Sequence, residues 1–171
     1  MVSFAGALVL NMGTLTPPWI ESMLLAAKKA RALGVPAVLE PVSSSATELC
    51  TRSSRRIIDE AGARVVRGNA SEVLSLTDNA SRTKGVDSAH SVDEASQAGR
   101  DLALATAVIG AFLAVEPDPL EATAAALAYV GLAGERAAAV SSGPGSLQVN
   151  LLDAMYNISP ADLAQGANIR A

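Results

Sequence analysis

The sequence predicts an α/β protein in which a short parallel sheet of about three strands is followed by a helical C-terminal half. Continuous apolar runs at 7–12 and 37–42, and a shorter one ending at Val66, are typical of strands covered on both faces. Helical patterns separate these runs, and strands that alternate with helices form parallel sheets with right-handed crossovers. No strand-like run follows Val66.

These observations predict a three-layer arrangement within one α/β domain that comprises residues 1–171. Residues 1–76 are expected to form a βαβαβ half, and residues 91–171 a helical half. We see no internal repeat and no low-complexity linker between the two halves.

The first expected helix begins shortly after Gly13, which ends the first strand. Thr16 is suited to cap this helix, and Pro17-Pro18 stands at its first positions, where a missing N–H group costs nothing. Apolar residues at helical spacing predict the side that packs on the sheet. They are Ile20, Met23, Leu24 and Ala27.

The second expected helix follows the serine-containing loop 43–47 and ends at Gly62. Its inward residues are predicted to be Leu49, Ile57, Ile58 and Ala61. Gly62 then leads into the strand that ends with Val65 and Val66, which we expect to be the central strand.

A brief helix is expected at 73–76, and the polar stretch 77–90 is predicted to be a surface loop. Ser91 and Glu94 form a capping-box pattern for the next helix, whose apolar spacing continues to residue 115. A single helix of that length would span roughly 37 Å at 1.5 Å per residue. The alternatives are therefore one long helix or a kink near Thr106.

Three further helices are expected towards the C-terminus. Asp118 and Pro119 are typical of a helix start, and the pattern that follows continues to about Val140. Residues 141–145 are predicted to form a turn before a helix at 146–157, and Ser159 is suited to cap a short last helix.

Composition excludes several classes of protein. With 171 residues, of which 50% are hydrophobic, the chain is able to bury a proper core. A formal net charge of −4, from 13 basic and 17 acidic residues, argues against a nucleic-acid partner. No apolar run is long enough to cross a bilayer, and a single cysteine is compatible with a reducing compartment. We expect a cytoplasmic protein with neither nucleic acid nor membrane as partner.

The stretch 64–73 contains the densest chemistry in the sequence. Arg67, Asn69 and Glu72 surround one strand-to-helix turn, and ligands of open α/β sheets bind outside the carboxyl ends of strands. A helix N-terminus there attracts phosphate, Arg67 adds a planar cation, and Glu72 is placed to hold a hydrated magnesium ion. A second interpretation needs no ligand: Asn69 is an N-cap, and Glu72 completes a capping box.

Four stretches carry a more specific pattern. They are LNMGTL at Leu10–Leu15, RGNASE at Arg67–Glu72, KGVDS at Lys84–Ser88 and GPGSLQV at Gly143–Val149. In this order they resemble the hydroxyethylthiazole kinase family of the ribokinase-like superfamily, and the resemblance covers most of the chain. It implies ATP-dependent phosphorylation of 4-methyl-5-(2-hydroxyethyl)thiazole, a step of thiamine salvage.

The resemblance also implies roles for particular residues. Arg67 would bind phosphate, Asn69 and Glu72 would hold Mg²⁺ and its water, and Glu72 would be the catalytic residue of an active chain. Asn11 and Gly13 would lie near the substrate. Family members are homotrimers with sites between subunits, so self-association of this chain is expected.

The sequence departs from the family at the reaction centre. Family members begin upstream of residue 1, and they carry a Gly-Thr-Gly-Cys turn whose backbone amides form an anion hole. Here Leu104-Ala105-Thr106 continues directly into the helix that would lie beyond that turn, so we expect two helices to be joined. Glu40-Pro41-Val42-Ser43 stands where the family has Asp-Pro-Val-Gly, and serine adopts positive φ less readily than glycine.

Two functional hypotheses follow. In the first, the chain is a shortened, natural or engineered, ribokinase-like scaffold without kinase activity, because a lost oxyanion-type donor costs on the order of 3 kcal/mol in the transition state. In the second, it is an active ATP- and Mg²⁺-dependent thiazole kinase with a rebuilt site. Cys50 is expected to be a small buried or half-buried side chain rather than the family's cysteine, and His90 a surface residue.

Overall fold

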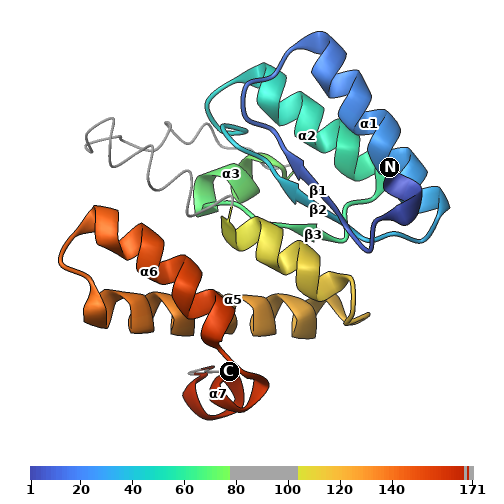
Figure 1. Ribbon diagram of the computed structural model, residues 1–171. Helices are drawn as coiled ribbons and strands as arrows, with labels where there is room; N and C mark the ends of the chain where they lie inside the picture. Colours follow the sequence, from blue (N-terminus) through green and yellow to red (C-terminus); the bar gives the residue numbers. More distant parts are fainter. Residues whose placement is uncertain (78–103, 168, 170–171) are drawn as a thin grey trace.

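The computed structural model describes residues 1–77, 104–167 and 169 (Figure 1). The elements in chain order are a 3₁₀ turn η1 (Val2–Phe4), β1 (Leu8–Asn11), α1 (Pro17–Ala32), β2 (Ala37–Glu40), α2 (Glu48–Ala61), β3 (Val65–Val66), α3 (Ala70–Ser75), a helical segment 104–113, α5 (Pro119–Val140), α6 (Pro144–Asn157) and α7 (Pro160–Gly166). The predicted loop at 77–90, apart from its first residue, and the predicted cap at Ser91 lie outside the described residues.

The three strands form one parallel sheet in the order β1-β2-β3. Leu10 pairs with Leu39, and Leu39 pairs with Val66, so β2 is the central strand. The prediction that the strand ending in Val66 is central was wrong. β2 is buried along its whole length because it has a neighbour on each side, whereas Val65 and Val66 are half-buried.

Helices cover both faces of the sheet, which confirms the predicted three-layer α/β fold. Helices α1 and α2 lie over one face, and segment 104–113 with α5 lies below the other (Figure 1). One core cluster joins α1 and α2 to the sheet through Leu10, Leu24 and Ile57. A second cluster joins Val38 of β2 to Ile109 and to α5. The sheet is therefore the layer shared by two hydrophobic cores.

The expected face of α1 is buried as predicted, with Ile20, Met23, Leu24 and Ala27 all inside. The Thr16 hydroxyl accepts a hydrogen bond from the Trp19 N–H at 3.4 Å, which confirms the predicted cap. In α2, Ile57 and Ala61 are buried and Ile58 packs at the edge of the core. Leu49 is 40% exposed, so its inward assignment was wrong: it lies in the first turn, beyond the edge of the sheet core.

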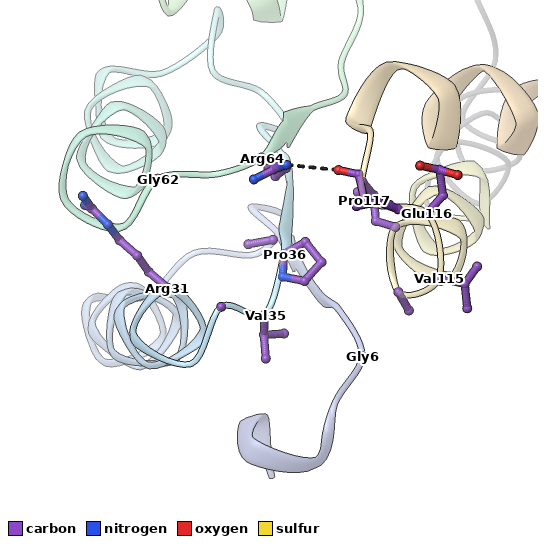
Figure 2. Close-up of a pocket in the computed structure, with 13 residues that line it drawn as sticks. Gly6, Arg31, Val35, Pro36, Gly62, Arg64, Val115, Glu116 and Pro117 are labelled. Atoms are coloured by element: carbon purple, nitrogen blue, oxygen red, sulfur yellow. Dashed lines mark hydrogen bonds between the residues drawn. The ribbon is translucent and has the colours of Figure 1, made fainter.

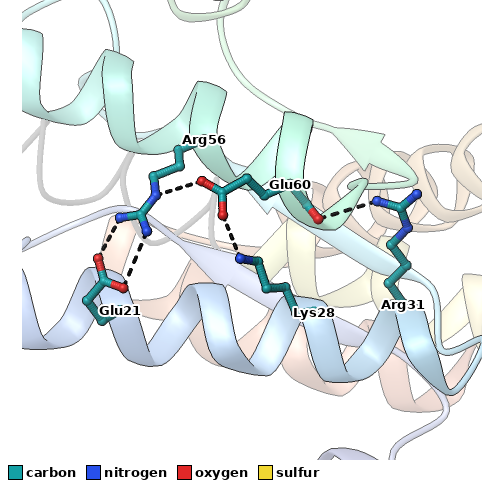
Figure 3. A network of polar contacts seen from close by, with 5 residues as sticks. All are labelled: Glu21, Lys28, Arg31, Arg56 and Glu60. Carbon is teal, nitrogen blue, oxygen red and sulfur yellow. Dashed lines mark hydrogen bonds and ion pairs between the residues drawn. The ribbon is translucent and has the colours of Figure 1, made fainter.

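A surface network of ion pairs joins α1 to α2 (Figure 3). The Glu60 carboxylate accepts from Lys28 Nζ at 2.5 Å and from Arg56 Nε at 2.8 Å. Arg56 also bonds Glu21 at 2.5 Å. Hydrogen bonds from Lys28 and Arg56 lower the pKa of the Glu60 carboxyl. Because these groups are exposed and screened by salt, the network orients the two helices more than it stabilises them.

The helical segment 104–113 is continuous across Thr106, and it ends before Val115, at a turn. Its close approach to β1 depends on Gly110, where a Cβ would lie 2.8 Å from Val9 Cγ2. The part of the predicted helix that precedes residue 104 lies outside the described residues.

We expect Gly110→Val to lower the free energy of unfolding by about 2 kcal/mol, because overpacking forces neighbouring side chains from their rotamers. Gly131→Val in α5 is the matched control, since a Cβ there meets no atom within 4 Å. Urea unfolding of both variants measures the difference. Equal stability of the two would contradict tight packing between this segment and β1.

The last three helices follow the predicted order. The Asp118 carboxylate caps α5 by accepting from the Leu120 and Glu121 N–H groups, as predicted. Helix α6 begins at Pro144, two residues earlier than predicted, because proline suits the first helical position and the Ser146 hydroxyl accepts from the Gly143 N–H. Ser159 caps α7 as expected. In the described part of the chain, no helix is long and apolar enough to span a membrane.

Candidate functional site

The carboxyl ends of the three strands bring polar side chains together. Asn11 ends β1, Glu40 ends β2, and Arg67 follows β3. The Asn11 amide donates from Nδ2 to Glu40 Oε2 at 2.6 Å, and Asn11 Oδ1 accepts from the Gly13 N–H at 2.8 Å. Arg67 Nη1 lies 3.7 Å from Glu40 Oε1. Of the residues predicted to contact substrate or phosphate, Asn11 and Arg67 therefore lie beside a single buried carboxylate, and Gly13 is bonded to Asn11.

Glu72 is held by two backbone groups. Its Oε2 accepts from the Asn69 N–H at 3.0 Å, and its Oε1 accepts from the Ser43 N–H at 3.1 Å. The Asn69 side chain accepts in return from the Glu72 N–H at 2.9 Å. This reciprocal pair confirms the capping box that was one of the two interpretations of this stretch. The metal and cofactor roles of Arg67, Asn69 and Glu72 stay predictions.

The loop between β2 and α2 wraps against α3. Ser43 has a φ of 61°, the left-handed conformation that its N–H bond to Glu72 helps to hold. The buried Ser44 hydroxyl donates to the Glu72 carbonyl at 3.0 Å and accepts from the Ser75 hydroxyl at 3.0 Å. Thr14, in the loop after β1, also has a positive φ, of 55°. Ser43 thus holds the loop between β2 and α2 in a conformation that glycine would adopt at lower cost. Strained backbone of this kind concentrates at functional sites.

Glu40 and Thr106 are the site residues that sequence reasoning missed. Glu40 is 1% exposed and Thr106 is fully buried, and the Thr106 hydroxyl is hydrogen-bonded to the Glu40 side chain. Glu40 could have been found from the sequence, because it is an acidic residue at the end of a predicted buried strand. Thr106 had no local signal, because only the packing of segment 104–113 against the sheet brings it to β2.

Burial raises the pKa of the Glu40 carboxyl above its ordinary value of 4.5, and nearby Glu72 raises it further. The Asn11 hydrogen bond, the Arg67 charge and Thr106 act in the opposite direction without cancelling the effect. The folded protein therefore binds a proton at Glu40 more tightly than the unfolded chain does. The stabilisation that this protonation contributes is fully present at pH values below 4.5. That support is lost as the pH rises through the raised pKa.

We expect Glu40→Gln to remove this pH dependence. The difference in free energy of unfolding between wild type and Glu40→Gln should therefore shift in favour of the variant as the pH is raised from about 4.5. Comparing the two proteins cancels the contributions of other carboxylates. Urea unfolding at several pH values measures this difference. If the free energies of unfolding of the two proteins changed in parallel with pH, the raised pKa would be contradicted.

Cys50 and His90, the two remaining residues considered from the sequence, are not part of the cluster at the carboxyl edge as the structure describes it. Cys50 is half-buried, as expected, and its N–H donates to Thr47 Oγ1 at 3.1 Å in the first turn of α2. His90 lies outside the described residues. Within residues 1–77, 104–167 and 169, no cluster of three or more His, Cys, Asp or Glu side chains is arranged to hold a metal ion.

The fold, a three-layer α/β arrangement with a polar cluster at the carboxyl ends of parallel strands, matches that of a protein of the ribokinase-like class. The family model described as "HK: Hydroxyethylthiazole kinase family" matches residues 1–106 and 97–161. A solved structure of a hydroxyethylthiazole kinase protein from Pyrococcus horikoshii OT3 is similar, with a TM-score of 0.79 and 28% identity over 99% of this chain and 78% of that one. The chain belongs to the hydroxyethylthiazole kinase family.

Curated relatives agree with this assignment. A hydroxyethylthiazole kinase from Desulfotalea psychrophila is 43% identical over 210 residues, covering 99% of this chain and 77% of the relative. One from Moorella thermoacetica is 41% identical over 210 residues, covering 99% of this chain and 79% of the relative. Because an alignment of 210 positions exceeds the 171-residue chain, at least 39 aligned positions have no residue here. The two family-model matches meet at 97–106.

Proposed function

We propose that this chain is a folded member of the hydroxyethylthiazole kinase family that does not transfer phosphate. The observation that carries the proposal is the internal shortening: at least 39 positions present in the relative are missing, and the family matches meet at 97–106. This is where the resemblance places the anion-hole turn. Phosphoryl transfer depends on positioned donors that stabilise charge on the transferred group, so losing that turn removes the main source of rate.

The geometry of the carboxyl edge supports the proposal. Thr106, which directly precedes the junction, is hydrogen-bonded to the buried Glu40 side chain. Glu72 accepts a backbone N–H at each carboxylate oxygen, and Arg67 faces Glu40. Asn69 and Glu72, which an intact kinase would offer to Mg²⁺, are therefore engaged within the protein, and Arg67 lies 3.7 Å from a carboxylate of the chain itself.

The test is product formation from ATP, Mg²⁺ and 4-methyl-5-(2-hydroxyethyl)thiazole, measured by mass spectrometry. The kinase from Desulfotalea psychrophila is the positive control. We expect product from the control and none above background from this chain. Product that is lost in Glu72→Gln would overturn the proposal, since a contaminating kinase would be unaffected by that change.

The alternative function is an active ATP- and Mg²⁺-dependent thiazole kinase with a rebuilt site. One observation favours it: Asn11, Arg67, Asn69 and Glu72 still gather at the carboxyl edge of the sheet. Under this alternative, the thiazole alcohol or a nucleotide should raise the melting temperature by mass action. Under the scaffold proposal, neither ligand shifts it.

We further propose that the chain self-associates, as a homotrimer by family resemblance or as another homo-oligomer. Large apolar side chains on the C-terminal helices support this, because monomeric proteins seldom expose several of them on neighbouring helices. They are Leu120 (77% exposed), Val149 (59%), Leu152 (57%) and Tyr156 (90%). Sedimentation equilibrium tests it, and a monomer at every concentration would contradict it. A cytoplasmic location without nucleic-acid or membrane partners stays a prediction from composition.

A further inference from the structure

Helix α3 is attached to the rest of the protein by polar groups. Its two buried side chains are Glu72 and Ser75. Its two large apolar side chains, Val73 and Leu74, are exposed and belong to neither of the two core clusters in the described structure. Because a helix of six residues is too short to be stable by itself, α3 depends on hydrogen bonds to neighbouring elements.

The loop between β2 and α2 takes part in several of these hydrogen bonds. The Ser43 N–H donates to Glu72 Oε1 at 3.1 Å, and the Ser44 hydroxyl donates to the Glu72 carbonyl at 3.0 Å. The Ser75 hydroxyl donates to the Ser44 hydroxyl at 3.0 Å. All three bonds are lost together if α3 moves away from this loop. The Ser43 N–H, 29 residues before Glu72, therefore reports whether α3 is in place.

Arg55 of α2 holds the other end of α3. Its Nη2 donates to the Ser75 carbonyl at 2.8 Å and to the Thr77 carbonyl at 2.9 Å. Carbonyls at the C-terminus of a helix lack partners within the helix and carry partial negative charge, so a guanidinium is favourable there. Arg55 Nε is buried and has no hydrogen-bond partner in the described structure. Since a buried donor without a partner costs free energy, this attachment is weaker than its two bonds suggest.

The chain that precedes α3 is fixed up to residue 67. The Arg67 N–H donates to the Leu39 carbonyl at 2.9 Å, which ties the end of β3 to β2. The Arg64 guanidinium donates from Nη2 to the Pro117 carbonyl at 3.0 Å, which ties the start of β3 to the turn before α5 (Figure 2). A movement of α3 therefore begins at Gly68, the first residue after these anchors.

The elements that α3 contacts are held by apolar packing instead. β2 is buried along its whole length, and α2 contributes Ile57 and Ala61 to the core. Burial of apolar surface is the main driving force of folding, and α3 buries little of it. Segments with few buried apolar contacts open at a lower free energy than the whole domain. α3 can therefore leave its place while both cores stay packed.

We propose that α3 opens as a unit while the rest of the protein stays folded, and that Arg55 is the latch that sets how often it opens. In the closed form both oxygens of the Glu72 carboxylate accept backbone N–H groups, and opening releases them to solvent. Access to Glu72 is thus controlled by a side chain of α2. This opening depends on the fold alone, so it occurs whether or not the chain transfers phosphate.

Amide hydrogen exchange of the full chain, followed by NMR under conditions where it measures the equilibrium of opening, tests the proposal. The reporters are the N–H groups of Ser43 and of Val73, which donates to the Asn69 carbonyl at 3.0 Å. Leu24, on the buried face of α1, is the reference for global unfolding. We expect Ser43 and Val73 to share one free energy of opening, lower than that of Leu24 and less dependent on urea, because opening α3 exposes little surface. Equal values at all three amides would overturn the proposal.

Arg55→Ala removes the latch. Because this change destabilises the closed form relative to both the open form and the unfolded chain, it should speed exchange about ten-fold at Ser43, Val73 and Leu24 alike. Ile57→Val weakens only the core that stays folded in the open form, so it should speed exchange at Leu24 about five-fold and leave Val73 unchanged. Exchange at Val73 that ignores Arg55→Ala, or that responds to Ile57→Val as strongly as Leu24 does, would contradict the proposal.

Arg52→Ala is the matched control, because Arg52 also belongs to α2 but pairs with exposed Glu48. Exchange at the three amides should equal that of wild type. A change at Val73 as large as that in Arg55→Ala would rule out Arg55 as the latch. Ser75→Ala removes a hydroxyl that bonds to the facing loop, so it too should speed exchange at Val73. If Arg55→Ala does not fold, Ser75→Ala decides by the same comparison.

Discussion

Replacing Glu40 by alanine is expected to lower the free energy of unfolding by about 3 kcal/mol. The change leaves Asn11 Nδ2 without its acceptor, removes the carboxyl oxygen that lies 3.7 Å from Arg67 Nη1, and leaves a cavity where the buried side chain stood. Arg67 Nη1 is already buried without a hydrogen bond in the described structure, so no second acceptor stands ready. Thermal and urea unfolding measure the loss.

Glu40→Gln separates the charge from the hydrogen bonds. Its amide oxygen can still accept from Asn11, and burial already disfavours the charged form of Glu40, so we expect a loss less than half that of alanine. If glutamine and alanine were equally destabilising, the negative charge itself would be what supports the fold. That result would contradict a raised pKa for Glu40.

Glu72→Ala is the second large effect, also expected to cost about 3 kcal/mol. The carboxylate serves the N–H groups of Asn69 and Ser43, and both lose a charged acceptor inside a nearly buried site. The loss should exceed the roughly 1 kcal/mol of an ordinary helix cap, because Ser43 must also keep a left-handed backbone without that bond. Urea unfolding gives the size of the effect.

Asn69→Ala and Glu48→Ala bracket this prediction. Asn69→Ala removes the cap of α3 and an exposed acceptor of the Ser71 hydroxyl, so about 1 kcal/mol is expected. Glu48 occupies the first turn of α2 but is exposed, and its removal should change stability very little. A loss in Glu72→Ala no greater than that in Asn69→Ala would show that the bond to Ser43 contributes nothing.

The two large effects share a consequence for function. The residues that family resemblance assigns to phosphate and metal are expected here to act on stability. If the chain is an inert scaffold, Glu72 variants should unfold more easily than wild type, and neither wild type nor variant should catalyse phosphate transfer. An active enzyme would instead lose turnover in Glu72→Gln in excess of any loss of folded protein, so measuring both quantities on the same variant distinguishes the proposals.

Local signals in the sequence were sufficient for most helices. Thr16 and Asp118 begin α1 and α5 as predicted, and the apolar face of α1 is the buried face. Such features depend on residues within one or two turns of each other, so a short stretch contains all the information. The start of α6 was missed because glycine and proline in residues 143–145 also suit a turn, and only the hydrogen bonds of Ser146 decide between them.

The sequence by itself determined the family, the α/β class and the residues available at the carboxyl edge. Only the tertiary structure decided how they are used. Asn11 meets Glu40 across 29 residues of chain, and Ser43 meets Glu72 across another 29. Which strand is central and which carboxylate is buried depend on such distant pairings. A buried charge takes its partners from wherever packing brings donors near, and local spacing holds no record of that choice.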